Sequence, residues 1–206
     1  MIDFFSILLH MDQYLTSIVG TYGILVYAIL FAIIFLETGL VVTPFLPGDS
    51  LIFVAGALAA AGLLGFTPLL VVMVIAAILG DTANYWIGHK LGRKASEGKV
   101  RFISKKHVDR SMKFYKKYGK KTIVMARFVP IIRTFAPFVA GIAKMDYRSF
   151  LSYNVVGGIA WVSAFLAAGY FFGNLDIVKN NLSAVIISII VITLIPPFVE
   201  LFRSRK

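Results

Sequence analysis

The sequence contains no cysteine, which excludes disulfide bonds and thiolate metal sites. Charged residues are scarce, at 15% of the 206 residues, whereas ordinary globular proteins carry roughly 25%. Apolar residues take their place: 59% of the chain is hydrophobic, and its mean hydropathy is +0.84. No HExxH, GxSxG or Walker motif occurs, so we expect neither an enzyme nor a bound metal or cofactor. The composition predicts an integral membrane protein with a single membrane domain.

The first twenty residues contain no lysine or arginine. A cleaved secretory signal begins with a basic region, so this segment does not fit one. We predict that residues 1–21 form an N-terminal segment at the membrane interface.

Basic residues are concentrated instead in the middle of the chain, where thirteen of the 21 lie between Lys90 and Lys121. Beside so much apolar sequence, this patch indicates a cytoplasmic loop near anionic lipid of the inner leaflet and not a nucleic-acid site. The spacing of Val108, Met112, Tyr115 and Tyr118 predicts an amphipathic helix there, beginning near Ser104 and ending at Gly119. This helix either lies on the leaflet or packs on the protein, and the sequence does not decide between these alternatives.

Apolar runs and their interruptions predict an all-α polytopic membrane protein. Membrane-spanning helices are expected at 22–36, 66–88, 148–172 and 182–202, with the basic loop at 89–121. If this loop and the C-terminus are both cytoplasmic, residues 122–143 begin and end on the cytoplasmic face, and residues 39–65 on the outer face. Since each segment contains helix-breaking prolines, we predict two re-entrant helical hairpins that enter from opposite faces and meet near mid-membrane.

An internal repeat supports this topology. The string FVAG occurs at 53–56 and again at 138–141, and ANYWIG at 83–88 aligns with AGYFFG at 168–173. Both matches have an offset of 85 residues, and the two copies end on opposite faces. We therefore expect an inverted repeat, the architecture in which transporters bind substrate between broken helices.

Four charged residues, Glu37, Asp49, Arg127 and Arg133, fall at predicted membrane depth, where each costs about 2.5–3.5 kcal/mol. Arginine offers a planar fork to phosphate oxygens, so Arg127 and Arg133 are candidates for binding an anion. Glu37 and Asp49 are candidates for coupling proton movement. The structural alternatives are ion pairs that join the hairpins, or a helix cap for Asp49.

Two further polar residues, Asp81 and Asn84, are secondary candidates for the site, with helix packing as the alternative. Asn154 is expected to make an interhelical hydrogen bond.

Three blocks carry a resemblance to a known family: FLETGLVVTPFLPGDSLIFVAGALA at 35–59, GDTANYWIG at 80–88 and ARFVPIIRTFAPFVAG at 126–141. They resemble the signature blocks of the DedA family, within the SNARE-associated or VTT-domain superfamily of membrane proteins. The similarity spans nearly the whole chain. The acidic pair of the family matches Glu37 and Asp49, and its arginine pair matches Arg127 and Arg133.

The resemblance implies a lipid transporter of the bacterial inner membrane, driven by the proton motive force. The leading expectation is a flippase that recycles undecaprenyl phosphate, a polyprenyl phosphate. A general phospholipid scramblase or a phosphatidylethanolamine transporter is the alternative, and a membrane chaperone or scaffold that moves no lipid is the second. Carboxylates serve sodium as well as proton gradients, and the sequence leaves open whether the chain forms a homo-oligomer.

Overall fold

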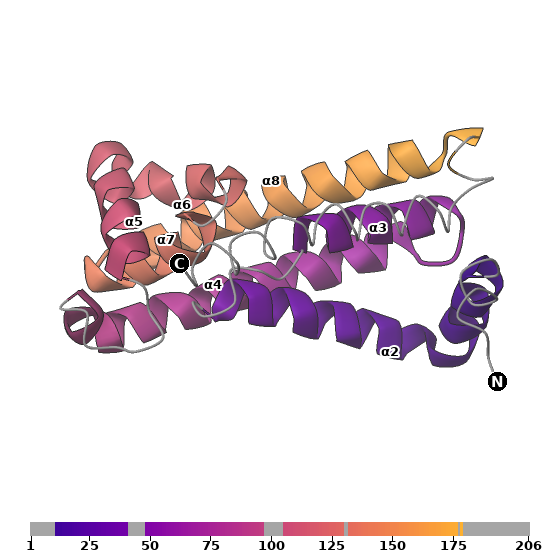
Figure 1. Cartoon of the computed structure of the whole chain (residues 1–206), viewed down its shortest axis with the longest axis horizontal. Helices are drawn as coiled ribbons and strands as arrows, with labels where there is room; N and C mark the ends of the chain where they lie inside the picture. Colours follow the sequence, from indigo (N-terminus) through magenta and orange to yellow (C-terminus); the bar gives the residue numbers. More distant parts are fainter. Residues whose placement is uncertain (1–10, 41–47, 97–104, 130–131, 177, 179–206) are drawn as a thin grey trace, which may run out of the picture. The chain divides into compact units, whose positions relative to one another are not determined.

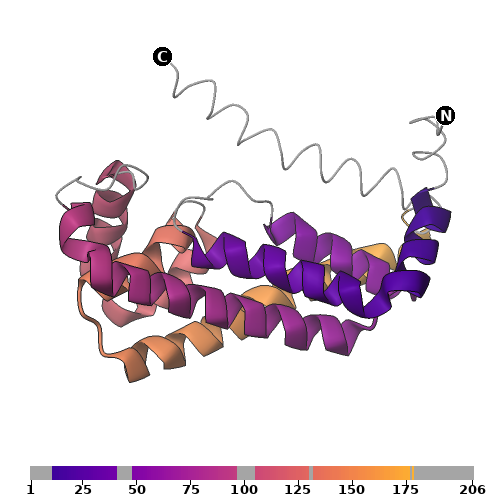
Figure 2. The same ribbon diagram turned by 90° about the horizontal axis from the view of Figure 1, so that it is seen from below.

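All secondary structure in the described part of the chain is helical, as the sequence predicts. The computed structural model describes residues 11–40, 48–96, 105–129, 132–176 and 178. The helices are α2 (Met11–Gly39), α3 (Gly48–Ala60), α4 (Phe66–Ser96), α5 (Lys105–Tyr118), α6 (Thr122–Met125), α7 (Ile132–Ile142) and α8 (Tyr147–Gly173), with the 3₁₀ turns η1 (Gly119–Lys121) and η2 (Ala126–Phe128). Both ribbon views show α2, α4 and α8 as the long helices (Figure 1, Figure 2).

Two of the long helices are apolar enough to cross a membrane. Phe66–Leu91 of α4 has 26 residues and a mean hydropathy of 2.0, and Tyr147–Gly173 has 27 residues and 1.8. At 1.5 Å per residue each reaches about 39 Å, longer than the hydrocarbon core of about 30 Å. The helices predicted at 66–88 and 148–172 are therefore present, and the one predicted at 182–202 lies outside the described residues.

Helix α2 runs from Met11 to Gly39 across the boundary predicted between residues 21 and 22, and the division into an interfacial and a membrane-spanning part stays a prediction. No proline interrupts this stretch, and its glycines lower helix propensity by only about 1 kcal/mol each. Residues 1–10 of the interfacial segment predicted at 1–21 lie outside the described part of the chain.

The second broken segment is interrupted where the sequence predicts it. The turn η2 ends at Phe128, Val129 is extended with φ −117° and ψ 111°, and α7 begins at Ile132. Of the first segment, residues 39–40 and 48–65 are described, and its prolines 44 and 47 lie outside the described residues. Pro137 is tolerated inside α7.

The chain divides into two compact units, and each is built from separate stretches of sequence. The first contains 1–30, 47–72 and 163–206, and the second contains 31–46 and 73–162. Helices α2, α4 and α8 contribute residues to both.

In the first unit, α3 packs against the C-terminal part of α8 (Figure 1). A Cβ atom on Gly169 would lie 2.7 Å from the carbonyl carbon of Phe53, and one on Gly56 would lie 2.9 Å from the backbone nitrogen of Tyr170. Real Cβ atoms essentially never come so close, so glycine is required for the two backbones to meet.

In the second unit, α7 packs against α4 by the same device. A Cβ on Gly88 would lie 2.8 Å from the carbonyl carbon of Phe138, and one on Gly141 would lie 2.7 Å from the backbone nitrogen of His89. Phe138 and Gly141 are the repeat partners of Phe53 and Gly56. With the offset of 85 residues, Gly169 of α8 corresponds to position 84 of α4. The observed contact is at Gly88, about one helical turn further along α4.

Helix α5 is amphipathic, as predicted, and its apolar face packs on α7. Val108 is buried in a cluster with Phe135, Phe138 and Val139, and Met112 packs against the same cluster. Gly119 ends the helix in the left-handed region, with φ +58°. Of the two alternatives that the sequence left open, packing on the protein is the one observed; the Ser104 cap lies outside the described residues.

Candidate functional site

A small polar pocket lies inside the second unit and is lined by residues from five elements. They are Glu37 and Thr38 of α2, Asp81 of α4, Arg127 of η2, Arg133 and Thr134 of α7, and Trp161 of α8. The cavity has a volume of about 20 Å³. Two arginines and two carboxylates therefore line one pocket.

A close crossing of α2 and α4 brings the acidic residues together. A Cβ on Gly80 would lie 2.9 Å from the carbonyl oxygen of Phe35 and 3.0 Å from the Cβ of Thr38. The absence of a side chain at Gly80 therefore lets the end of α2 lie directly on α4. This crossing places Glu37 and Asp81 at the same pocket, because Glu37 precedes Thr38 and Asp81 follows Gly80.

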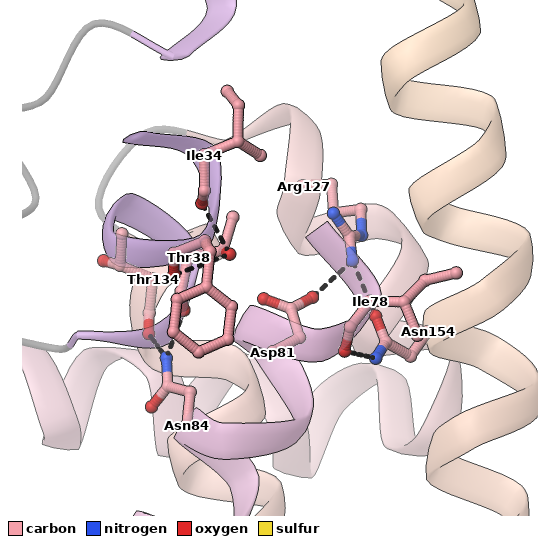
Figure 3. A network of polar contacts seen from close by, with 9 residues as sticks. Ile34, Thr38, Ile78, Asp81, Asn84, Arg127, Thr134 and Asn154 are labelled. Carbon is pink, nitrogen blue, oxygen red and sulfur yellow. Dashed lines mark hydrogen bonds and ion pairs between the residues drawn. The ribbon is translucent and has the colours of Figure 1, made fainter. Parts of the chain in front are cut away.

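Arg127 forms an ion pair with Asp81, and both side chains are buried. Its guanidinium also donates to Oδ1 of Asn154 at 2.6 Å, and Nδ2 of Asn154 donates to the carbonyl oxygen of Ile78 at 3.0 Å (Figure 3). The interhelical hydrogen bond expected of Asn154 is confirmed. Asn154 thus holds Arg127 and α4 together from α8.

Glycines in α8 make room for the Arg127 side chain. A Cβ on Gly157 would lie 3.1 Å from both Cδ and Nε of Arg127, and one on Gly158 would lie 3.6 Å from a terminal nitrogen. Because neither glycine has a side chain, Arg127 can lie along α8 at these two positions and extend to Asp81.

Arg133 forms an ion pair with Glu37. The Glu37 residue is only 1% exposed, whereas the Arg133 side chain is 17% exposed. Nδ2 of Asn84 donates to the carbonyl oxygens of Thr38 at 3.0 Å and Thr134 at 2.7 Å, and so connects the end of α2 to the start of α7 (Figure 3). Asn84 supports this ion pair from α4.

Trp161 contacts both arginines with its ring. The Cζ atoms of Arg127 and Arg133 lie 5.7 Å and 5.5 Å from the ring centroid, within the range of cation–π attraction. The indole is 2% exposed, so water screens these contacts little. Trp161 stabilises two cations in one place.

Comparison with known proteins gives the family. Residues 46–171 match the VTT domain family model. Over 209 aligned residues the chain is 51% identical to Protein DedA of Escherichia coli, covering 100% of this chain and 94% of that protein. The chain belongs to the DedA family. No solved structure matches it.

Other relatives of this DedA-family chain are named as membrane proteins. An uncharacterized membrane protein of Mycobacterium tuberculosis is 39% identical over 193 residues, covering 91% of this chain and 85% of the relative. The inner membrane protein YghB of Escherichia coli is 36% identical over 157 residues, covering 76% and 72%. Together with the two apolar helices, these relatives show a membrane protein.

The DedA-family fold brings together most, but not all, of the residues that the sequence singled out. Glu37, Asp81, Arg127 and Arg133 line one pocket, and Asn84 hydrogen-bonds beside it. Asp49 lies in the first turn of α3, in the other unit, and is not among the lining residues. The acid that pairs with Arg127 is therefore Asp81, which the sequence ranked only as a secondary candidate.

Sequence reasoning missed Trp161, Thr38 and Thr134. Trp161 carried a usable signal: tryptophan in membrane proteins gathers at the interfaces, and this one lies in the middle of an apolar span. The two threonines carried no signal, because their role depends on the crossing of α2 with α4 and on α7.

Chemically, the pocket combines two guanidinium groups with two carboxyl groups. A guanidinium binds carboxylate and phosphate oxygens through the same planar fork. Within the described residues, no group of three histidine, cysteine or acidic side chains could hold a metal ion. The arrangement therefore suits an oxyanion ligand.

Proposed function

We propose that this DedA-family protein transports a lipid phosphate across the cytoplasmic membrane, with undecaprenyl phosphate as the leading substrate and the proton gradient as the driving force. The observation that carries the proposal is the pair of arginines, buried Arg127 and partly buried Arg133, on one tryptophan ring. Arginines at membrane depth are costly, and they persist where they have a role in binding or transport. The phosphate binds the arginines while the polyprenyl tail stays in lipid between the helices.

We further propose that the two broken segments are re-entrant hairpins of an inverted repeat. Two observations support this. Helix α3 of the first repeat packs on α8 of the second, and α7 of the second packs on α4 of the first. Both contacts use the repeat-related residues Phe53 and Phe138 and Gly56 and Gly141, although the glycines they meet, Gly169 and Gly88, differ by about one helical turn in the repeat register. Such paired packing is expected if the halves are related by a two-fold axis in the membrane plane.

The basic segment at 90–121 is proposed to lie on the cytoplasmic face, against anionic lipid. The apolar face of α5 is covered by α7, so the attraction is electrostatic and does not depend on insertion. Arg110, Lys113, Lys116 and Lys117 are exposed on α5. Each basic residue near an anionic surface contributes about 1 kcal/mol.

The experiment is a flipping assay on the purified full chain in liposomes, with a panel of labelled lipids and an imposed pH gradient. We expect transport of a polyprenyl phosphate that depends on the gradient and is abolished in Arg133→Ala. Arg148→Ala removes an exposed arginine outside the pocket and should leave transport unchanged.

Two results would replace the proposal. Movement of phosphatidylethanolamine and other phospholipids regardless of head group and gradient would indicate a scramblase. No lipid movement at all, with the protein folded, would indicate a scaffold. Normal transport by Arg133→Ala would end the role given to the arginines.

A further inference from the structure

The pocket contains a balanced set of charges. Arg127 is paired with Asp81, and Arg133 with Glu37. Among the lining residues, Thr38, Thr134 and Trp161 carry no charge, and Asn154 beside Arg127 is neutral as well. Among the described residues that line the pocket, the charged groups are therefore two positive and two negative.

The carboxylates occupy the guanidinium nitrogens that a phosphate would use. A terminal nitrogen of Arg127 is bonded to Asp81, and a terminal nitrogen of Arg133 is bonded to Glu37. A phosphate that binds the same nitrogens through the guanidinium fork has to displace these carboxylates.

Charge imposes the same exchange. A phosphate dianion added to the four ionised groups would leave two uncompensated negative charges in a buried site, which is strongly unfavourable. If both carboxylates take up a proton, the two arginines carry two positive charges and match the dianion.

From this we infer that protons and the lipid phosphate exchange at the same two arginines, and that the exchanging carboxylates are Glu37 and Asp81, not Glu37 and Asp49. The inference rests on the proposed function and deepens it by naming the second coupling residue. Protonation of Glu37 releases Arg133, and protonation of Asp81 releases Arg127. Arg127 stays in place during the exchange because Asn154 continues to accept its hydrogen bond.

The exchange predicts a proton count. Calorimetry of the purified full chain, titrated with farnesyl phosphate in buffers of different protonation enthalpy, gives the protons taken up per phosphate bound. About pH 8 is suitable, because a phosphate monoester with its second pKa at about 6 is then a dianion. We expect about two protons for the natural chain, one for each carboxylate released.

Matched aspartate variants identify the residue responsible. Asp81→Asn should bind the phosphate more tightly at pH 8 and take up one proton fewer. Asp49→Asn and the exposed control Asp109→Asn should retain the full count. A lower count in Asp49→Asn, with the full count in Asp81→Asn, would overturn the inference and leave the transport proposal intact.

The natural chain provides a second measurement in case Asp81→Asn does not fold. Since two protons accompany each phosphate, its affinity should fall about 100-fold for each pH unit above 8. An affinity independent of pH would refute the exchange. If farnesyl phosphate does not bind at any pH, the proposed function fails as well.

Discussion

The ion pair between Glu37 and Arg133 allows a quantitative test of how the site is held together. Breaking a buried pair by removing one partner costs about 3–5 kcal/mol, because the other charge is left without compensation. Arg133→Gln leaves Glu37, which is 1% exposed, so we expect the upper end, about 5 kcal/mol. Glu37→Gln leaves Arg133, which is 17% exposed and can reach water, so we expect about 3 kcal/mol.

The double variant Glu37→Gln/Arg133→Gln should be more stable than either single variant. It places two neutral amides where the ion pair stood, so no charge is left without compensation. A hydrogen bond between neutral groups changes the free energy of unfolding by only about 1 kcal/mol. The coupling energy of the cycle, which is the two single losses together minus the loss of the double variant, is then at least about 5 kcal/mol in favour of the pair.

Thermal unfolding in detergent, followed by tryptophan fluorescence, measures these differences. For a chain of this length 1 kcal/mol shifts the Tm by about 2–4 °C, so Glu37→Gln should lower it by about 6–12 °C. The exposed control Arg148→Gln should change stability by less than about 0.5 kcal/mol. If the double variant loses the sum of the two single losses, Glu37 and Arg133 do not interact and the pocket described here is wrong.

Three further predictions test other parts of the structure. Gly88→Ala should destabilise the protein by about 1–3 kcal/mol because its methyl group meets α7 backbone, whereas Gly23→Ala, with no atom within 4 Å, should stabilise α2 by up to about 1 kcal/mol; equal thermal shifts would contradict this. Trp161→Leu should reduce transport in liposomes roughly 2- to 30-fold relative to Trp161→Phe, which keeps a ring for the cations; equal rates would exclude a cation–π role. The backbone N–H of Ser149 donates to Asp146 at 2.9 Å and lowers the pKa of that carboxyl, so the stabilisation is complete above the ordinary value of 3.8 and is lost as pH falls. The Tm difference between the natural chain and Asp146→Ala should therefore vanish in acid. An equal difference at every pH would contradict a stabilising hydrogen bond from Ser149 to the ionised Asp146.

Much of the fold follows from local sequence features. The spans in α4 and α8 are long apolar runs, the break near residue 130 follows from a proline between apolar segments, and α5 ends at a glycine in the left-handed region. The beginning of α2 could not be predicted, because a change from polar to apolar residues marks a change of environment and does not end a helix. The packing of α5 on α7 could not be predicted from the sequence of α5, because its amphipathic pattern suits a membrane surface equally well.

The sequence alone determined that acids and arginines must meet. Charged side chains in an apolar chain are stable only beside opposite charges, so Glu37, Arg127 and Arg133 had to converge wherever the fold placed them. Only the tertiary structure decided which acid meets which arginine. Asp81, not Asp49, reaches Arg127, because Arg127 lies along the bare helix surface at Gly157 and Gly158, and distance along the chain contains no information about such a contact.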